Sequence, residues 1–245
     1  MVNKLEFYAR VRDGLRFNWQ EISGLIVAVL VTGFIFSFRD WGAEQFDLIV
    51  GLKNLFLVFI VAAVSFLFRL SCQKSYALAA GKKVEFKLWW AGILIALTLA
   101  FLTMGRLPLV FIGGVTVAFM VRHRLGEFRY GPSWSVNGYI GLWGILGNLI
   151  MAILFSIGAY ILPQSYFFHK GVILNLIMAG CALVPLPQLD GMLVFFSNRF
   201  VYMLAWVTII LAAILLLTGT KIGLIMAIII GGTAGMIALL IGSDK

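Results

Sequence analysis

Residues 182–193, ALVPLPQLDGML, place a carboxylate directly after a proline-broken stretch of a very apolar chain. Proline lacks a backbone N–H and clashes with the preceding helical turn, so Pro185 and Pro187 predict that a helix beginning near Gly171 ends near Val184. Backbone groups freed at membrane depth need protein or water as partners, and we therefore expect the segment to lie inside a helix bundle. A carboxylate in such a place, here Asp190, is a functional candidate that can pair with a cation.

Asp190 also has a purely structural interpretation. Asp190-Gly191 precedes the apolar run MLVFF. An aspartate in this position can cap a helix by accepting hydrogen bonds from its first free amides. The two interpretations are compatible, and the sequence leaves both open.

The composition defines the class of protein that must position this carboxylate. Of 245 residues, 62% are hydrophobic and 12% are charged, and the mean hydropathy is +1.04. These values are far from those of soluble domains and predict an all-α polytopic membrane protein that forms one membrane domain, residues 1–245. Its first part, residues 1–22, has the pattern of an amphipathic helix on a membrane surface, with a disordered tail as the alternative. Residues 206–245 are expected to form C-terminal helices.

Apolar runs of membrane length predict about six to eight transmembrane helices, one of them broken by proline. The runs lie near residues 23–38, 47–68, 89–105, 108–121, 137–162, 171–187, 192–218 and 222–242. The third and fourth are short, and they form either a re-entrant hairpin or two thin spans. Gly231 and Gly235 make a GxxxG pattern in the last run, which allows close helix packing.

The positive charges of the chain predict its orientation. The net charge is +9, but the cations are scattered over short loops, which argues against nucleic-acid binding. With eight spans, one side of the membrane carries Arg10, Arg12, Arg16, Lys74, Lys82, Lys83, Lys87, Arg122, Arg124 and Arg129, and the other carries only Arg39, Arg106, Lys170 and Lys221. The positive-inside rule makes the first side cytoplasmic, with both termini on it, most simply in a cell membrane.

Two polar stretches, residues 81–90 and 126–138, interrupt the apolar pattern. In the first, Val84, Phe86 and Leu88 alternate with charged residues, which is the period of a strand. We therefore expect a short β-ribbon at the cytoplasmic face.

The segment PLPQLDG resembles the signature NxxPxPxLDG of the site-2 protease family, the intramembrane zinc metalloproteases. The matching residues are Pro185, Pro187, Leu189, Asp190 and Gly191, while Ala182 stands where the family has asparagine. Residues 141–154 are similar to the family's AGPLAN segment through Gly144 and Asn148, with Ile145 in place of its proline. Residues 84–89 are similar to its EFRxW stretch. The resemblance covers about residues 50–205 and implies that Asp190 stands at the position of the third zinc ligand.

The chain departs from the family pattern at the zinc-binding motif. The family carries HExxH on the preceding helix, where two histidines hold zinc and the glutamate acts as general base. Counting back from Gly81 by the family's spacing places this motif at residues 69–73, where Arg69, Leu70 and Gln73 replace its essential residues. We therefore expect no catalytic residues and no zinc cofactor.

Arg69 has two possible positions. It can take the place of the metal and pair with Asp190, or extend to the cytoplasmic interface beside Lys74. A third possibility is an unconventional metal site made of Cys72, Cys181, Asp190 and a histidine. The cysteines are more simply core residues, with no disulfide required, and both histidines, His123 and His169, are more simply solvated.

Three functions remain open from the sequence. The first is an inactive homologue, a pseudoprotease, that binds or regulates another membrane protein in contact with lipid, either a transmembrane-helix client or a related active protease. The second is an active intramembrane zinc metalloprotease with an unconventional site, which metal content would reveal. The third is a small transporter or channel, which requires flux that depends on Asp190.

Overall fold

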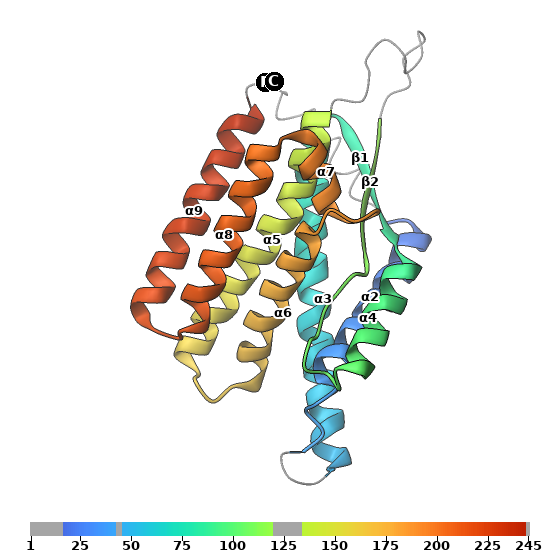
Figure 1. Ribbon diagram of the computed structural model, residues 1–245, viewed down its shortest axis with the longest axis vertical. Coiled ribbons are helices and arrows are strands. Elements are labelled where there is room, and N and C mark those ends of the chain that lie inside the picture. The colour runs from blue at the N-terminus through green and yellow to red at the C-terminus, as the bar shows by residue number, and fades with distance from the viewer. Residues whose placement is uncertain (1–16, 43–45, 120–133, 244–245) are drawn as a thin grey trace.

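The computed structural model describes residues 17–42, 46–119 and 134–243, which contain eight helices and two strands. The order along the chain is α2 (Trp19–Ser37), α3 (Leu48–Ala79), β1 (Lys82–Leu88), α4 (Trp90–Leu102), β2 (Gly113–Phe119), α5 (Trp134–Ile161), α6 (Tyr166–Leu183), α7 (Asp190–Ser197), α8 (Arg199–Leu217) and α9 (Lys221–Ser243) (Figure 1). The expected features of residues 1–16, including an amphipathic helix, lie outside the described residues.

Six of these helices, α2, α3, α5, α6, α8 and α9, are long and apolar enough to cross a membrane. The chain is therefore a multi-pass membrane protein of mostly helical structure, as the composition predicts. Six spans lie within the expected range of six to eight. The run 89–105 gives α4, whose 13 residues reach only about 20 Å, and the described part of the run 108–121 gives extended chain and β2, so neither of these two runs forms a span of membrane length.

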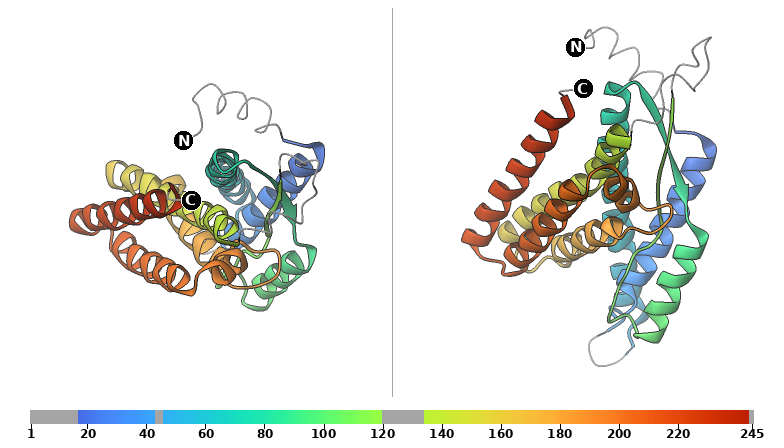
Figure 2. Two further views of the ribbon diagram at one scale, coloured as in Figure 1. Left: turned by 90° about the horizontal axis from the view of Figure 1, so that it is seen from above. Right: turned by 45° about the horizontal axis from the view of Figure 1, so that its top comes forward.

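Helix α5 is the centre of the bundle. It packs against α3, α6, α7, α8 and α9, and Figure 2 shows α8 and α9 grouped apart from α2, α4 and the ribbon. Small residues on α5 permit this close packing. A Cβ added to Gly138 would lie 2.1 Å from the Cβ of Ser197, for example, so α7 can approach only because that position is glycine.

The two strands form an antiparallel ribbon in which Val84 is opposite Val117 and Phe86 is opposite Val115. Val84 and Phe86 are buried, which confirms the strand predicted from the alternation in residues 81–90. Its partner strand, residues 113–119, precedes the second polar stretch, residues 126–138. Of that stretch, residues 126–133 lie outside the described residues and residues 134–138 begin α5.

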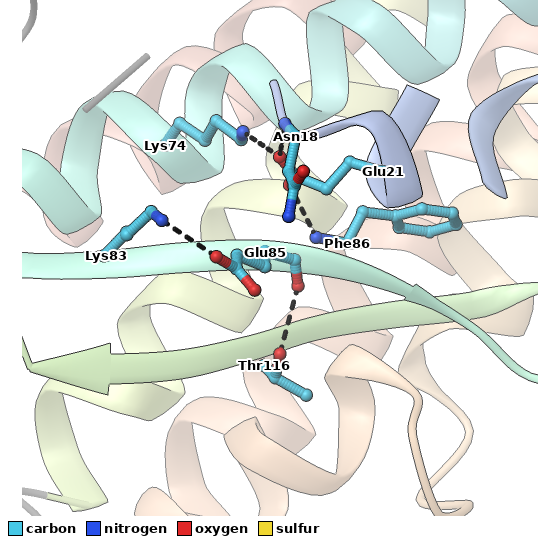
Figure 3. Close-up of polar contacts among 7 residues, drawn as sticks. All are labelled: Asn18, Glu21, Lys74, Lys83, Glu85, Phe86 and Thr116. Carbon is cyan, nitrogen blue, oxygen red and sulfur yellow. Dashed lines mark hydrogen bonds and ion pairs between the residues drawn. The ribbon is translucent and has the colours of Figure 1, made fainter. Parts of the chain in front are cut away.

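A buried ion pair holds the ribbon to the helices. Lys74 Nζ lies 2.9 Å from Glu21 Oε2, and both side chains are almost fully buried. The other oxygen of Glu21 accepts a hydrogen bond of 2.9 Å from the Phe86 amide, as Figure 3 shows. Glu21 thereby connects α2, α3 and β1. Lys74 was expected in a cytoplasmic loop, and this assignment is wrong because the residue lies inside α3.

Candidate functional site

Asp190 is the meeting point of three elements. It is the first residue of α7 and is fully buried. Its Oδ2 lies 2.6 Å from Arg69 Nη2 and 2.8 Å from Gln73 Nε2, both on α3. Its Oδ1 accepts a hydrogen bond of 3.3 Å from the Val115 amide of β2. The carboxylate therefore joins the end of the proline-broken segment to the helix α3 and to the ribbon.

These contacts show whether Arg69 pairs with Asp190 or extends to the interface, and whether Asp190 caps a helix. Arg69 is only 6% exposed and points at the carboxylate, so it does not extend to the interface. The expected capping role of Asp190 is wrong. The N-cap of α7 is Leu189, and none of the described hydrogen bonds to the Asp190 carboxylate comes from the first amides of α7.

Helix α5 closes the site from a third side. A Cβ added to Gly144 would lie 2.4 Å from Gln73 Nε2 and 2.7 Å from Asp190 Oδ2. A Cβ on Gly147 would lie 3.2 Å from the Cα of Arg69, and one on Gly114 of β2 would lie 2.8 Å from Asp190 Oδ1. Glycine at these positions allows α5 and β2 to pack closely around Arg69, Gln73 and the buried carboxylate of Asp190. A methyl group at position 144 or 114 would force a neighbouring group of the site to shift, whereas one at position 147 would require the Arg69 backbone to give by only a few tenths of an ångström.

Buried amide groups beside the site are not fully satisfied. Among the residues that the structure describes, Gln73 Oε1 has no hydrogen-bond partner, and neither Oδ1 nor Nδ2 of Asn148 has one. Asn148 follows Gly144 by one helical turn and is fully buried. Leu70, by contrast, is 1% exposed and belongs to the apolar core. The position at which the family resemblance places a general base is therefore purely a packing position.

The proline segment lies differently from the expectation. Pro185, Pro187 and Gln188 are exposed, whereas Leu183, Leu189 and Asp190 are buried. The segment as a whole does not lie inside the bundle, and only its two ends do. The chain turns at Gln188, which has a positive φ of 64°. Gly191 then passes against the end of α6, where a Cβ would lie 2.1 Å from the Leu183 carbonyl oxygen.

The other metal-binding candidates are not brought together. Cys72 and Cys181 are free thiols, and Cys181 Sγ accepts a hydrogen bond of 3.4 Å from the Val110 amide. His169 Nε2 contacts the Pro163 carbonyl oxygen at 2.7 Å, at the exposed start of α6, and His123 lies outside the described residues. Within the described ranges, no three His, Cys, Asp or Glu side chains form a group that could hold a metal ion.

The residues at the Asp190 site do not fit zinc. A zinc ligand must offer a lone pair. The guanidinium of Arg69 has only N–H donors, and Gln73 presents its amide nitrogen to the carboxylate. The charge-assisted hydrogen bond from Arg69 neutralises Asp190 in the way that a bound cation would. Both carboxylate oxygens of Asp190 are already engaged, because Oδ2 accepts hydrogen bonds from Arg69 and Gln73 and Oδ1 accepts one from the Val115 amide.

The exposed side of β1 carries a second, weaker ion pair (Figure 3). Lys83 Nζ lies 2.9 Å from Glu85 Oε1, and this hydrogen bond lowers the pKa of Glu85. Thr116 Oγ1 of β2 donates to the Glu85 carbonyl oxygen at 3.2 Å. Both charged side chains are more than one-third exposed, so the pair contributes little to stability and leaves the buried Glu21 as the anchor of the ribbon.

Two parts of the site were missed by sequence reasoning. The Val115 amide cannot be found from a motif because it is backbone, and the pairing that positions it joins residues far apart in the chain. The Glu21 contact with Lys74 spans 53 residues. Its only sequence signal is Glu21 itself, which is an isolated carboxylate at the start of an apolar run.

The comparisons with known proteins give one informative match. The chain is 29% identical over 192 residues to a protein of Methanocaldococcus jannaschii named "Putative zinc metalloprotease MJ0611", and the match covers 76% of this chain and 89% of that protein. No family model matches the chain, and no solved structure matches it. The chain is thus a multi-pass membrane protein that is similar, over most of its length, to a protein named as a putative zinc metalloprotease.

Proposed function

We propose that this chain is a catalytically inactive, site-2-protease-like membrane protein that binds or regulates another membrane protein. One observation carries the proposal: Arg69 and Gln73, at the positions where the family resemblance places zinc-binding histidines, donate hydrogen bonds to Asp190 at 2.6 and 2.8 Å. A salt bridge stands where a metal centre would be required. The similarity to a protein named as a putative zinc metalloprotease supports a relationship to that class of protein. The hydrogen-bond donors of Arg69 and Gln73 around Asp190 argue against zinc-dependent hydrolysis by this chain.

Peptide-bond hydrolysis needs an activated water and a group that accepts its proton. At this site Leu70 has no proton-accepting group, and the Arg69 guanidinium has only N–H donors. Asp190 is engaged by Arg69, Gln73 and Val115. None of these side chains is free to take a proton from water, so we expect no cleavage activity.

The surface beside Asp190 supports a binding role. Pro185, Pro187 and Gln188 are exposed at the end of a helix that is otherwise built for the membrane. The Gln188 carbonyl lies against β2, because a Cβ on Gly114 would be 2.6 Å from its oxygen. The exposed loop and the ribbon together offer backbone groups that a partly unwound transmembrane helix can pair with.

Photocrosslinking in native membranes tests the binding role. A photoreactive amino acid is placed at Gln188, and a matched control carries it at Gln20, which is also an exposed glutamine but lies on the first turn of α2. We expect a discrete membrane protein to be captured from position 188 and not from position 20. Identical products from both positions would contradict the role of this surface.

The captured partner then serves to test inactivity. It is co-expressed with the wild type and with Asp190→Asn, and its length is followed by immunoblotting. The proposal predicts an intact partner in both cases. Cleavage by the wild type that disappears in Asp190→Asn would show that the chain is an active protease.

A further inference from the structure

A second charged layer lies at the opposite end of the bundle from the ribbon. Asn54 Nδ2 on α3 donates to the Asp40 carbonyl oxygen at 2.8 Å, just beyond the end of α2. Twenty residues of α3 separate Asn54 from Lys74, the partner of Glu21. At 1.5 Å per residue this is about 30 Å, the thickness of a bilayer's hydrocarbon core. The two polar layers are therefore separated by about the thickness of a membrane's hydrocarbon core.

This second layer contains a pocket of about 450 Å³ between the C-terminal ends of α2 and α4 and the side of α6. Its polar lining consists of Arg39, Asp40, Arg106 and Lys170. Three cations and one carboxylate leave two positive charges unbalanced. The pocket is therefore suited to an anion.

The carboxylate in the pocket is already engaged. Lys170 Nζ lies 2.6 Å from Asp40 Oδ2, and the Tyr166 hydroxyl donates to the same oxygen at 2.5 Å. Within the part of the chain that the structure describes, no carboxylate forms an ion pair with Arg39 or Arg106. Both guanidinium groups keep their full set of donors for a ligand.

The backbone brings the two arginines to one place. Gly105 has a φ of +70°, and a Cβ there would lie 3.0 Å from both Arg39 Cγ and Phe38 Cβ. Phe38 in turn packs edge-on against Phe101 of α4, with ring centroids 5.2 Å apart. The end of α2 is thereby fixed against the end of α4. Arg39 and Arg106 both line this pocket.

The apolar part of the lining indicates the kind of anion. Ile173 and Ile177 line the pocket from α6 and follow one another by a single helical turn towards the membrane interior. Ile173 is 38% exposed. A charged head at the arginines with an aliphatic chain along these isoleucines matches a lipid, whereas a soluble anion would gain nothing from them.

We propose that this pocket binds the phosphate group of an anionic phospholipid through Arg39 and Arg106, with its acyl chain along Ile173 and Ile177. Guanidinium groups bind phosphate by two parallel hydrogen bonds, and two of them can hold one phosphate from opposite sides. Lys170 stays with Asp40 and adds positive potential. The site is separate from Asp190, and it does not depend on whether the chain is a protease.

Native mass spectrometry of the purified full chain tests the proposal. The protein is titrated with phosphatidylglycerol or with phosphatidylcholine of the same acyl chains, and the fraction that retains one lipid is measured. We expect preferential retention of phosphatidylglycerol. The double variant Arg39→Gln/Arg106→Gln should weaken it by about tenfold or more, because two charge-assisted contacts are lost. Lys221→Gln is the matched control, since it removes an exposed cation at the start of α9, and it should leave retention unchanged.

Three results would overturn the proposal. Equal retention of the two lipids by the wild type would show that the headgroup charge is not recognised. Unchanged retention of phosphatidylglycerol in the double variant would place any anionic lipid elsewhere. Displacement of the lipid by millimolar inorganic phosphate would make the ligand a soluble anion. The first measurement needs no variant, so the proposal stays testable even if the substitutions impair folding.

Discussion

Substitution of Asp190 by asparagine is expected to destabilise the chain strongly because it leaves a buried charge without its partner. Asp190 is fully buried, and Arg69, at 6% exposure, has its guanidinium 2.6 Å from the carboxylate. In Asp190→Asn the side-chain volume is kept, and Gln73 can still donate to the remaining oxygen. The charge of Arg69, however, is no longer neutralised. Removing one member of a buried ion pair costs about 3–5 kcal/mol.

The double variant Arg69→Met/Asp190→Asn tests whether the unneutralised charge of Arg69 causes the loss of stability. It removes both charges and keeps an unbranched apolar side chain on α3, so it should be about 1–3 kcal/mol more stable than Asp190→Asn alone. For a chain of this size, about 1 kcal/mol corresponds to roughly 2–4 °C in the unfolding midpoint. The single variant should therefore unfold about 10 °C below the wild type, and the double variant should recover part of that loss.

Thermal unfolding in mild detergent, followed by tryptophan fluorescence, measures the whole double-mutant cycle with Arg69→Met as its fourth member. The reasoning requires non-additivity, because the two groups interact directly. If the effects of the two single substitutions add to within about 0.5 kcal/mol, the ion pair has no energetic role and the reasoning fails.

Three other predictions follow from the contacts. Gly144→Ala should lower the free energy of unfolding by about 1–3 kcal/mol, because its Cβ would lie 2.4 Å from the buried Gln73 amide nitrogen. Its control is Gly180→Ala, which has open space around it and should leave the free energy of unfolding unchanged or raise it in the same assay. Glu21→Gln should speed hydrogen exchange at the Phe86 amide by loosening the ribbon, and adding Lys74→Met should restore part of the lost stability; unchanged exchange in Glu21→Gln would argue against the anchor. Reporters fused to the two ends of the chain should both be active on the cytoplasmic side, and a split result would refute the orientation.

The site was predictable from the sequence where residue type alone carries the signal. Pro185, Pro187 and Asp190 identify the broken helix and its carboxylate, and the register of the resemblance identifies Arg69 as the residue opposite it. Sequence could not decide whether Arg69 reaches Asp190 or the interface, because both positions satisfy a long cationic side chain. That choice depends on how closely α5 approaches, which Gly144 and Gly147 allow.

The fold was predictable where the hydrophobic periodicity is unambiguous, and it was not predictable where an apolar run is short and continuous. The alternation in residues 82–88 predicts β1 correctly. The run 108–121 is continuously apolar, and such a run reads equally as a thin span or as a buried strand. Its β-branched residues and the glycine pair at Gly113 and Gly114 suit a strand that passes close to another backbone. Pairing with β1 then makes this segment a strand, and the local sequence of residues 108–121 does not reveal that pairing.

The proposed inactivity requires that Asp190 binds a side-chain cation and not a metal ion. The zinc content of detergent-purified protein, measured by mass spectrometry for the wild type beside Asp190→Asn, tests this most directly. The account predicts far less than one zinc per chain in both proteins and no difference between them. Close to one zinc per chain in the wild type, lost in Asp190→Asn, would contradict it and would establish Asp190 as a metal ligand.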